Sequence, residues 1–177
     1  MLAPSYSSPA ETPKEVVFVL DNSGSMAGDK IKQAKDSLSF CLKSLRKNDR
    51  FNVLIFNNSV TAYKDAMVSA DDENIKAAIR YVNSFNTSGG TNIKMALSEA
   101  VRMFSNSKSA LKLVVFVTDG IPTVEETDVK KILAGIKTTA QEPGIRVFPF
   151  GVGYDVDAYF LDRIAENHKG ISEYVLP

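Results

Sequence analysis

The amino-acid sequence predicts an α/β fold with three layers: a doubly wound (Rossmann-like), mostly parallel sheet with one antiparallel edge strand and helices on both faces. Three patterns predict it. Short, continuously apolar runs, such as residues 15–20 and 111–117, are typical of strands buried on both faces of a sheet. Amphipathic segments with a helical period alternate with these runs. A short turn at residues 57–59 joins two of the runs and indicates an antiparallel pair.

The expected strands are short runs rich in β-branched and aromatic residues, bounded by polar residues or glycine. In chain order they are residues 15–20, 51–56, 60–63, 111–117, 146–150 and 171–175. The second and third runs form the hairpin, so the third run is expected to be the antiparallel edge strand.

The expected helices are segments in which apolar residues recur every three or four positions and form one stripe that faces the sheet. In chain order they are residues 30–45, from Asp71 or Asp72 to about 83, from Thr91 to 104, 128–140 and 157–166. Asp71 or Asp72 is expected to cap the second of these helices through its side-chain oxygen, and Thr91 is expected to open the third.

The length of 177 residues fits one ordinary domain. Residues 1–14 contain three prolines and three serines and little apolar content, so they are expected to be a linker or tail. The domain itself is expected to span residues 15–177.

Charge and composition narrow the classes of function. Lys plus Arg and Asp plus Glu each number 21, and this balance argues against nucleic acid as a partner. No apolar run approaches the roughly 20 residues that a membrane-spanning helix needs, so no membrane insertion is expected. The chain has one cysteine, Cys41, and one histidine, His168, which excludes an intrachain disulfide and a thiolate zinc site. A Ser-His-Asp or Cys-His mechanism would have to use His168, which is expected in solvent at a helix end.

Two of the expected strands are followed by an aspartate, Asp21 after the first and Asp119 after the most apolar one. In open α/β sheets, ligands bind beyond the carboxyl ends of the strands. If these two strands are neighbours, both carboxylates lie above the same edge of the sheet.

Three hydroxyl side chains are expected at that same edge. Ser23 and Ser25 flank Gly24 just after the first strand, and Thr91 follows two glycines at a helix start. Carboxylates and hydroxyls without sulfur or imidazole form a hard-oxygen set, which suits Mg²⁺ first, with Mn²⁺ or Ca²⁺ as alternatives. Each of the three segments alone is typical of an ordinary turn or helix cap, and only their combination at one edge favours a metal site.

These segments resemble the metal-ion-dependent adhesion site (MIDAS) of the von Willebrand factor type A (VWA) domain family. The matching segments are Asp21-Asn22-Ser23-Gly24-Ser25, Gly90-Thr91-Asn92 and Thr118-Asp119-Gly120. Further segments, including residues 51–57, 118–123 and 151–157, resemble the VWA domains of inter-alpha-trypsin inhibitor heavy chains and their bacterial relatives.

The resemblance implies which residues bind the ion. Ser23 and Ser25 would bind it directly, and Thr91 directly or through water. Asp21 and Asp119 would act directly or through water. It also implies that the domain is not an enzyme, and that an Asp or Glu of a protein partner completes the shell of the ion.

The leading hypothesis is therefore a metal-dependent, adhesion-type protein-binding module in a larger extracellular or cell-surface protein, with a cytoplasmic location left open. One alternative is a metal-dependent hydrolase or phosphoryl-transfer enzyme. Against it, Ser23 stands where phospho-aspartate enzymes need a second acidic residue. Another alternative is an intracellular VWA adaptor that docks onto an ATPase assembly. The sequence does not predict the oligomeric state.

Overall fold

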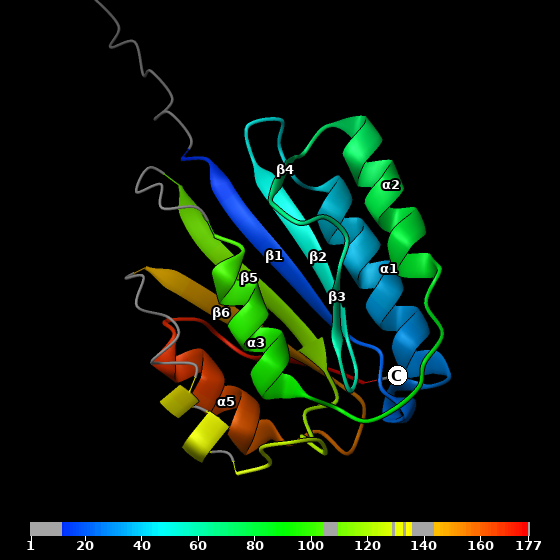
Figure 1. Cartoon of the computed structure of the whole chain (residues 1–177), viewed down its shortest axis with the longest axis vertical. Helices are drawn as coiled ribbons and strands as arrows, with labels where there is room; N and C mark the ends of the chain where they lie inside the picture. The colour runs from blue at the N-terminus through cyan, green and yellow to red at the C-terminus, as the bar shows by residue number, and fades with distance from the viewer. Residues whose placement is uncertain (1–11, 105–109, 129, 133, 136–143, 177) are drawn as a thin grey trace, which may run out of the picture.

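The computed structural model describes residues 12–104, 110–128, 130–132, 134–135 and 144–176. Its centre is a seven-stranded sheet in the order β3-β2-β1-β5-β6-β7, with β4 also paired to β2 (Figure 1). The strands are β1 (Lys14–Asp21), β2 (Arg50–Phe56), β3 (Val60–Ala62), β4 (Val68–Ser69), β5 (Leu111–Thr118), β6 (Ile145–Val152) and β7 (Glu173–Val175). The main helices are α1 (Asp29–Lys43), α2 (Asp72–Asn83), α3 (Ile93–Arg102) and α5 (Ala158–Asn167), and η1 (Gly24–Met26) is a short 3₁₀ helix.

The predicted fold class is confirmed. Strand β1 pairs in parallel with β2 on one side and β5 on the other, and β6 and β7 continue the parallel part of the sheet. Strand β3 is antiparallel to β2 at the edge, as the short turn predicted. The same edge carries a second antiparallel segment, β4, which the sequence did not predict because a two-residue strand is too short to leave a pattern.

Helices lie on both faces of the sheet, α1 and α2 on one and α3 and α5 on the other (Figure 1). Because side chains alternate along a strand, β1 feeds both halves of the core. Val17 and Val19 pack with residues of α3 and α5, while Phe18 and Leu20 pack with residues of α1 and α2. The central strands are therefore buried on both faces, which explains their unbroken apolar sequence.

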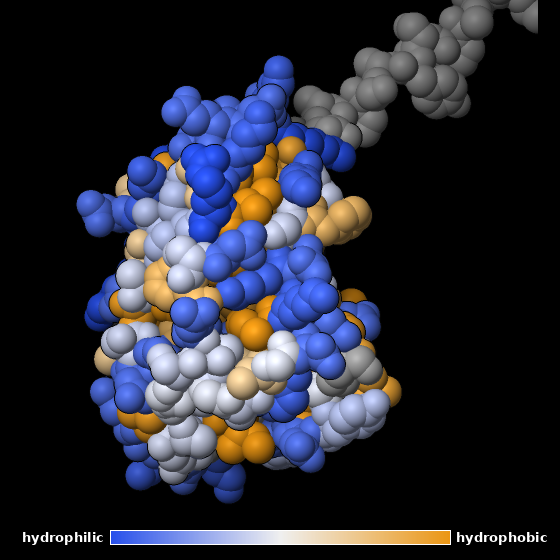
Figure 2. Space-filling model, turned by 90° about the vertical axis from the view of Figure 1, so that its right-hand side faces the viewer, coloured by the Kyte–Doolittle hydropathy of each residue, from blue (hydrophilic) through white to orange (hydrophobic). Residues whose placement is uncertain are grey.

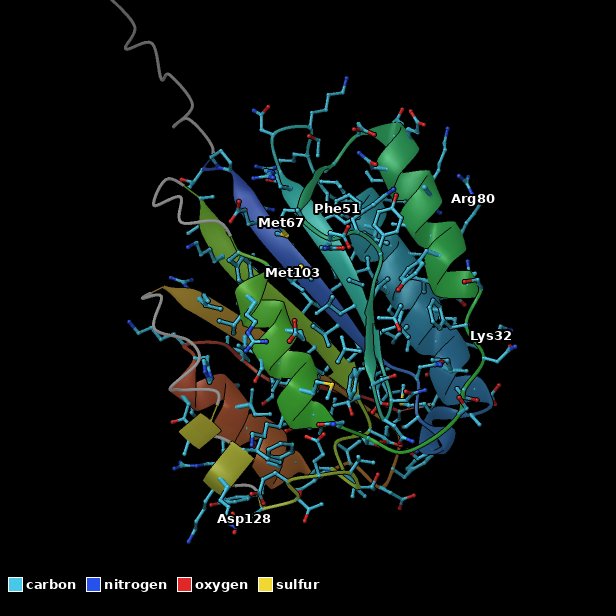
Figure 3. The ribbon with its side chains drawn as sticks, in the orientation of Figure 1. Lys32, Phe51, Met67, Arg80, Met103 and Asp128 are labelled. Atoms are coloured by element: carbon cyan, nitrogen blue, oxygen red, sulfur yellow. The ribbon has the colours of Figure 1, made fainter. Side chains whose placement is uncertain are left out.

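The outer surfaces of α1 and α2 are mostly polar, although Phe40 on α1 is exposed. Lys32 on α1 and Arg80 on α2 point away from the sheet (Figure 3). In the view of that side of the molecule, hydrophilic side chains predominate and leave smaller apolar areas between them (Figure 2). Within the described ranges, every helix is too short or too polar to span a bilayer.

The helix starts differ slightly from the prediction. Asn92, rather than Thr91, caps α3 by accepting a hydrogen bond from the backbone N–H of Met95, so Thr91 stays in the preceding loop. Of the two aspartates considered for α2, Asp71 is the cap.

Two other expectations fall partly outside the described residues. Residues 1–11 of the expected linker lie outside the described residues. Lys14, which was expected to be the last residue of the linker, is the first residue of β1. Of the helix expected at 128–140, residues 130–132 and 134–135 are helical, while 129, 133 and 136–140 lie outside the described part.

Asn52 in β2 has a buried polar side chain, and the sequence did not predict its role in the structure. Its amide nitrogen donates hydrogen bonds to the carbonyls of Lys64 (2.7 Å) and Ala66 (3.3 Å), and its amide oxygen accepts one from the N–H of Lys64 (3.2 Å). It therefore ties the β3–β4 connection to the sheet.

We expect Asn52→Ala to lower the free energy of unfolding by about 2–3 kcal/mol, because the three hydrogen bonds between this buried amide and the connection are lost. Urea unfolding measures this, with Asn83→Ala at the exposed end of α2 as the control. The control should change stability by less than about 0.5 kcal/mol. Equal unfolding curves for the two variants would show that water replaces the amide without cost.

Candidate metal centre

The two aspartates that follow strands lie at the same edge of the sheet. Strands β1 and β5 are parallel neighbours, with Leu20 in register with Val117, so their carboxyl ends lie side by side. The loops that leave these ends lie in the lower part of Figure 1. Asp21 and Asp119 therefore stand together at the edge where open α/β sheets bind ligands.

Asp21 is fully buried and held at both carboxylate oxygens. One accepts a hydrogen bond from the N–H of Ser23 (2.8 Å) and the other from the hydroxyl of Thr118 (2.6 Å). Burial raises the pKa of Asp21 to about 6, although the hydrogen bonds from Thr118 and Ser23 lower it, and the charge of Asp119 raises it further. An ionised carboxylate in this position is unfavourable without a nearby cation.

Asp119 leaves one buried oxygen without a partner. Only 4% of the residue is exposed, and its Oδ2 lies 3.4 Å from the ammonium of Lys30. Its Oδ1 is buried and accepts no hydrogen bond from any described residue. Buried polar atoms are almost always satisfied, so this carboxylate oxygen is available to a ligand from outside the chain.

The serine hydroxyls lie next to each other in the turn after β1. The Oγ atoms of Ser23 and Ser25 are 3.0 Å apart. The short helix η1 begins between them, and buried Met26 anchors its end in the core. Ser23 is buried and Ser25 is exposed, so the pair runs from the interior towards solvent.

The loop that carries Thr91 is tied to both of the other loops. The N–H of Gly24 donates a hydrogen bond to the carbonyl of Gly89 (3.0 Å). The N–H of Thr91 donates to the hydroxyl of Thr123 (2.9 Å), and the N–H of Thr123 donates back to the carbonyl of Thr91 (3.1 Å). The structure therefore brings together the three segments that carry Asp21, Ser23, Ser25, Thr91 and Asp119.

Close packing of these loops explains why Gly90 has no side chain. A Cβ atom there would lie 2.4 Å from Cγ2 of Val124 and 2.8 Å from Oγ1 of Thr123. The N–H of Gly90 donates to the side-chain oxygen of Asn58 (2.6 Å), which links the loop to the β2–β3 turn.

Supporting residues of the site could not be assigned roles from the sequence. Thr118 and Thr123 hold Asp21 and Thr91 through side-chain hydroxyls, and Lys30 contacts Asp119. Thr118 directly precedes Asp119 and Thr123 follows it by four residues, and this closeness in sequence was the one available signal. Lys30 gave none, because it lies 89 residues from Asp119 in the chain.

The donor set fits a hard divalent cation. It offers two carboxylates and three hydroxyls, the ligand type that Mg²⁺, Mn²⁺ and Ca²⁺ prefer. No cluster of three or more His, Cys, Asp or Glu side chains suited to a metal occurs within the described residues. A site with only two acidic members therefore depends on hydroxyl, water or external oxygens to complete a shell.

The lone histidine lies away from this site. The expectation that His168 is solvated is wrong: the residue is 7% exposed, and its Nδ1 lies 3.0 Å from the carbonyl of Ile164. Its backbone carbonyl accepts a hydrogen bond from Val147, near the amino end of β6 and thus at the opposite end of the sheet. Cys41 is half-buried, and burial raises the pKa of its thiol.

We expect Thr118→Val to weaken Mg²⁺ binding about tenfold or more, because residues that orient ligands typically contribute 10–100-fold to metal affinity. The variant keeps the shape of the side chain but removes the hydroxyl that holds Asp21. Calorimetric titration measures the change, with Thr61→Val on the exposed edge strand β3 as the control. Unchanged affinity in Thr118→Val would mean that Asp21 needs no such support.

Comparisons with known proteins agree with the predicted fold and family. A family model described as the von Willebrand factor type A domain matches residues 14–174. Curated relatives include inter-alpha-trypsin inhibitor heavy chain H2 of Mus musculus (36% identical over 170 residues) and heavy chain H4 of Homo sapiens (34% over 170 residues). Each alignment covers 92% of this chain and 18% of the relative, so the chain spans less than a fifth of the length of these proteins.

Solved structures show the same fold. A von Willebrand factor type A protein from Catenulispora acidiphila superposes with a TM-score of 0.82 at 24% identity, covering 93% of this chain and 39% of that one. The pilus adhesin SpaC from Lactobacillus rhamnosus GG, in its open conformation, gives a TM-score of 0.73 at 16% identity, covering 92% and 28%.

Proposed function

The chain belongs to the von Willebrand factor type A domain family, and from this premise we propose that it is a metal-ion-dependent protein-binding module and not an enzyme. The observation that carries the proposal is the buried, unpartnered Oδ1 of Asp119 near Asp21, whose carboxylate in turn accepts a hydrogen bond from Ser23. Ser23, Ser25, Thr91 and Asp119 would hold the ion, with Asp21 acting directly or through water. Mg²⁺ is the proposed ion, and Mn²⁺ or Ca²⁺ would fit the same oxygens.

A bound divalent cation supplies an electrophilic centre that accepts one more oxygen ligand from outside the chain. The chain's own residues define what can approach it. Three of the five proposed ligands are neutral hydroxyls, and the ammonium of Lys30 lies against one of the two carboxylates, so a divalent ion here would leave the site with a net positive charge. We propose that an Asp or Glu side chain of a protein partner supplies the external oxygen, because it brings both negative charge and reach.

The loops around the site provide a rim for such a partner. Ile121 follows Asp119 and is 47% exposed, and Tyr154 in the loop after β6 is 75% exposed. Exposed aromatic and aliphatic side chains around a polar centre are typical of protein-binding surfaces. The loops that carry Asn22, Gly89 and the segment 121–123 would complete this rim and select among partners.

Catalysis has little support from the residues near the site. Hydrolysis or phosphoryl transfer needs a group that accepts or donates a proton near the reacting atoms. The only histidine lies at the other end of the sheet, and the buried carboxylate of Asp21 already accepts two hydrogen bonds.

We further propose that the domain works at the cell surface or outside the cell, within a longer protein.

A peptide library displayed on phage tests this function without a known partner. Selection on the immobilised domain in Mg²⁺ should enrich peptides that share an Asp or Glu. Those peptides should lose binding in a chelator, after Asp→Asn or Glu→Gln exchange, and on an Asp119→Ala domain. Enriched peptides that bind equally well in chelator would show that partners use another face.

A further inference from the structure

Lys30 is a cation placed where the helix dipole disfavours it. It is the second residue of α1, and positive charges in the first turn of a helix are destabilising. The side chain turns towards the metal centre, where its ammonium lies 3.4 Å from Oδ2 of Asp119, and it is only 20% exposed. Asp119 thus has one oxygen next to a cation and the other without a partner.

The chain leaves space for this side chain at Gly153. A Cβ atom at Gly153 would lie 2.6 Å from Cε of Lys30 and 3.1 Å from its Nζ. Gly153 has a positive φ of 115°, and its N–H donates a hydrogen bond to the carbonyl of Val175, which fixes the loop after β6. The loop after β6 therefore packs against the Lys30 side chain and holds it in its orientation towards Asp119.

We propose that Lys30 is the counter-ion of the metal-free site and thereby lowers its affinity for the divalent cation. The inference rests on the proposed metal-binding function. Without an ion, Asp21 and Asp119 place two carboxylates in a buried position, and the ammonium of Lys30 offsets part of their charge. When an ion binds, the same ammonium lies beside a second positive centre and repels it.

These two effects are linked by thermodynamics. If an interaction stabilises the metal-free state more than the metal-bound state, the free energy of metal binding becomes less favourable by the difference between the two stabilisation energies. Lys30 would stabilise the metal-free domain. By weakening binding, it would also make the fraction of domains that hold an ion depend on the ion concentration around the protein. A purely structural role, in which Lys30 only orients Asp119, predicts the opposite sign for its removal.

The test compares Lys30→Met with Lys32→Met. Methionine keeps the apolar stem beside Gly153 but removes the charge, and Lys32 is the exposed neighbour on α1 that points away from the sheet (Figure 3). In chelator, Lys30→Met should melt about 2–4 °C below the wild type, whereas Lys32→Met should match it. In calorimetric titrations, Lys30→Met should bind Mg²⁺ about five- to tenfold more tightly than the wild type, and Lys30→Arg should stay within about threefold of it.

Weaker Mg²⁺ binding by Lys30→Met would overturn the proposal and leave Lys30 as a positioning residue for Asp119. Equal melting of Lys30→Met and the wild type in chelator would also overturn it, since no counter-ion would have been lost. If the wild type binds none of the three ions, the proposed function fails, and with it the claim about affinity. The melts in chelator would still decide separately whether Lys30 stabilises the buried carboxylates.

Discussion

Saturating Mg²⁺ should raise the melting temperature of the wild-type protein by about 5–10 °C over its value in chelator, and Asp119→Ala should show no such rise. The expected shift follows from linkage: an ion present at 100 times its dissociation constant adds about 2.7 kcal/mol to the free energy of unfolding. For a domain of this size each kcal/mol raises the melting temperature by about 2–4 °C. Asp119→Ala removes one of only two anionic ligands, so we expect at least about a hundredfold loss of affinity.

Asp65→Ala is the matched control for this experiment. Asp65 is exposed in the connection between β3 and β4, so its removal changes the net charge equally without touching the site. The control should keep the full shift with Mg²⁺. Equal shifts in Asp119→Ala and the wild type would place the bound ion elsewhere.

Asp21→Asn separates metal binding from folding. Asparagine keeps an oxygen to accept the hydrogen bond of Ser23 or Thr118 but carries no charge into the buried position. In chelator the variant should be as stable as the wild type or slightly more so, because a buried charge has been removed. It should gain no stability from Mg²⁺. A large loss of stability in chelator would show that the charge of Asp21 is needed for the fold itself.

Gly170→Ala is expected to be among the most destabilising single substitutions in the domain, with a loss of about 3–4 kcal/mol in the free energy of unfolding. Gly170 lies in the turn between α5 and β7. A Cβ atom there would lie 1.7 Å from the carbonyl oxygen of Val147 and 2.6 Å from its carbonyl carbon. Both atoms belong to the backbone of β6, so a change of rotamer cannot relieve the overlap.

The turn itself has no freedom to move away. The N–H of Gly170 donates to the carbonyl of Ala165, and the N–H of Val147 donates to the carbonyl of His168. Thermal melts by circular dichroism measure the effect, with Gly135→Ala as the control because a Cβ there makes only an ordinary contact of 3.5 Å with Cε of Lys94. The control should change stability by less than about 1 kcal/mol. A Gly170→Ala protein that melts with the wild type would mean that β6 and the turn separate easily.

The sequence predicted those features of the fold that depend on local patterns. The strands β1 and β5 are long enough to show a continuous apolar run, and α1 is long enough to show the helical period of its apolar stripe. Strand β4 has two residues and left no such signal. Asn52 stands in an otherwise apolar strand, and only the fold shows that its amide bonds to the backbone of residues 64 and 66.

The candidate site divides in the same way. Its five oxygen-bearing residues stand in short motifs, four of them at or just after strand ends and Thr91 just before a helix, so the sequence was sufficient to propose them as candidates. The hydrogen bond from Thr118 to Asp21 joins residues 97 positions apart, and the contact of Lys30 with Asp119 joins residues 89 apart. Contacts of this kind depend on which strands and loops become neighbours, and no local pattern encodes them.

The central claim is that this site binds a divalent cation. A structure from crystals soaked in Mn²⁺, with anomalous scattering recorded at the manganese absorption edge, tests it most directly. Mn²⁺ accepts the same hard oxygen ligands as Mg²⁺ and can be located by its own signal. We expect one strong anomalous peak bounded by oxygens of Ser23, Ser25, Thr91 and Asp119, and no peak there in an Asp119→Ala crystal. The absence of a peak at this position in the wild type, at Mn²⁺ concentrations that shift its melting temperature, would contradict the account.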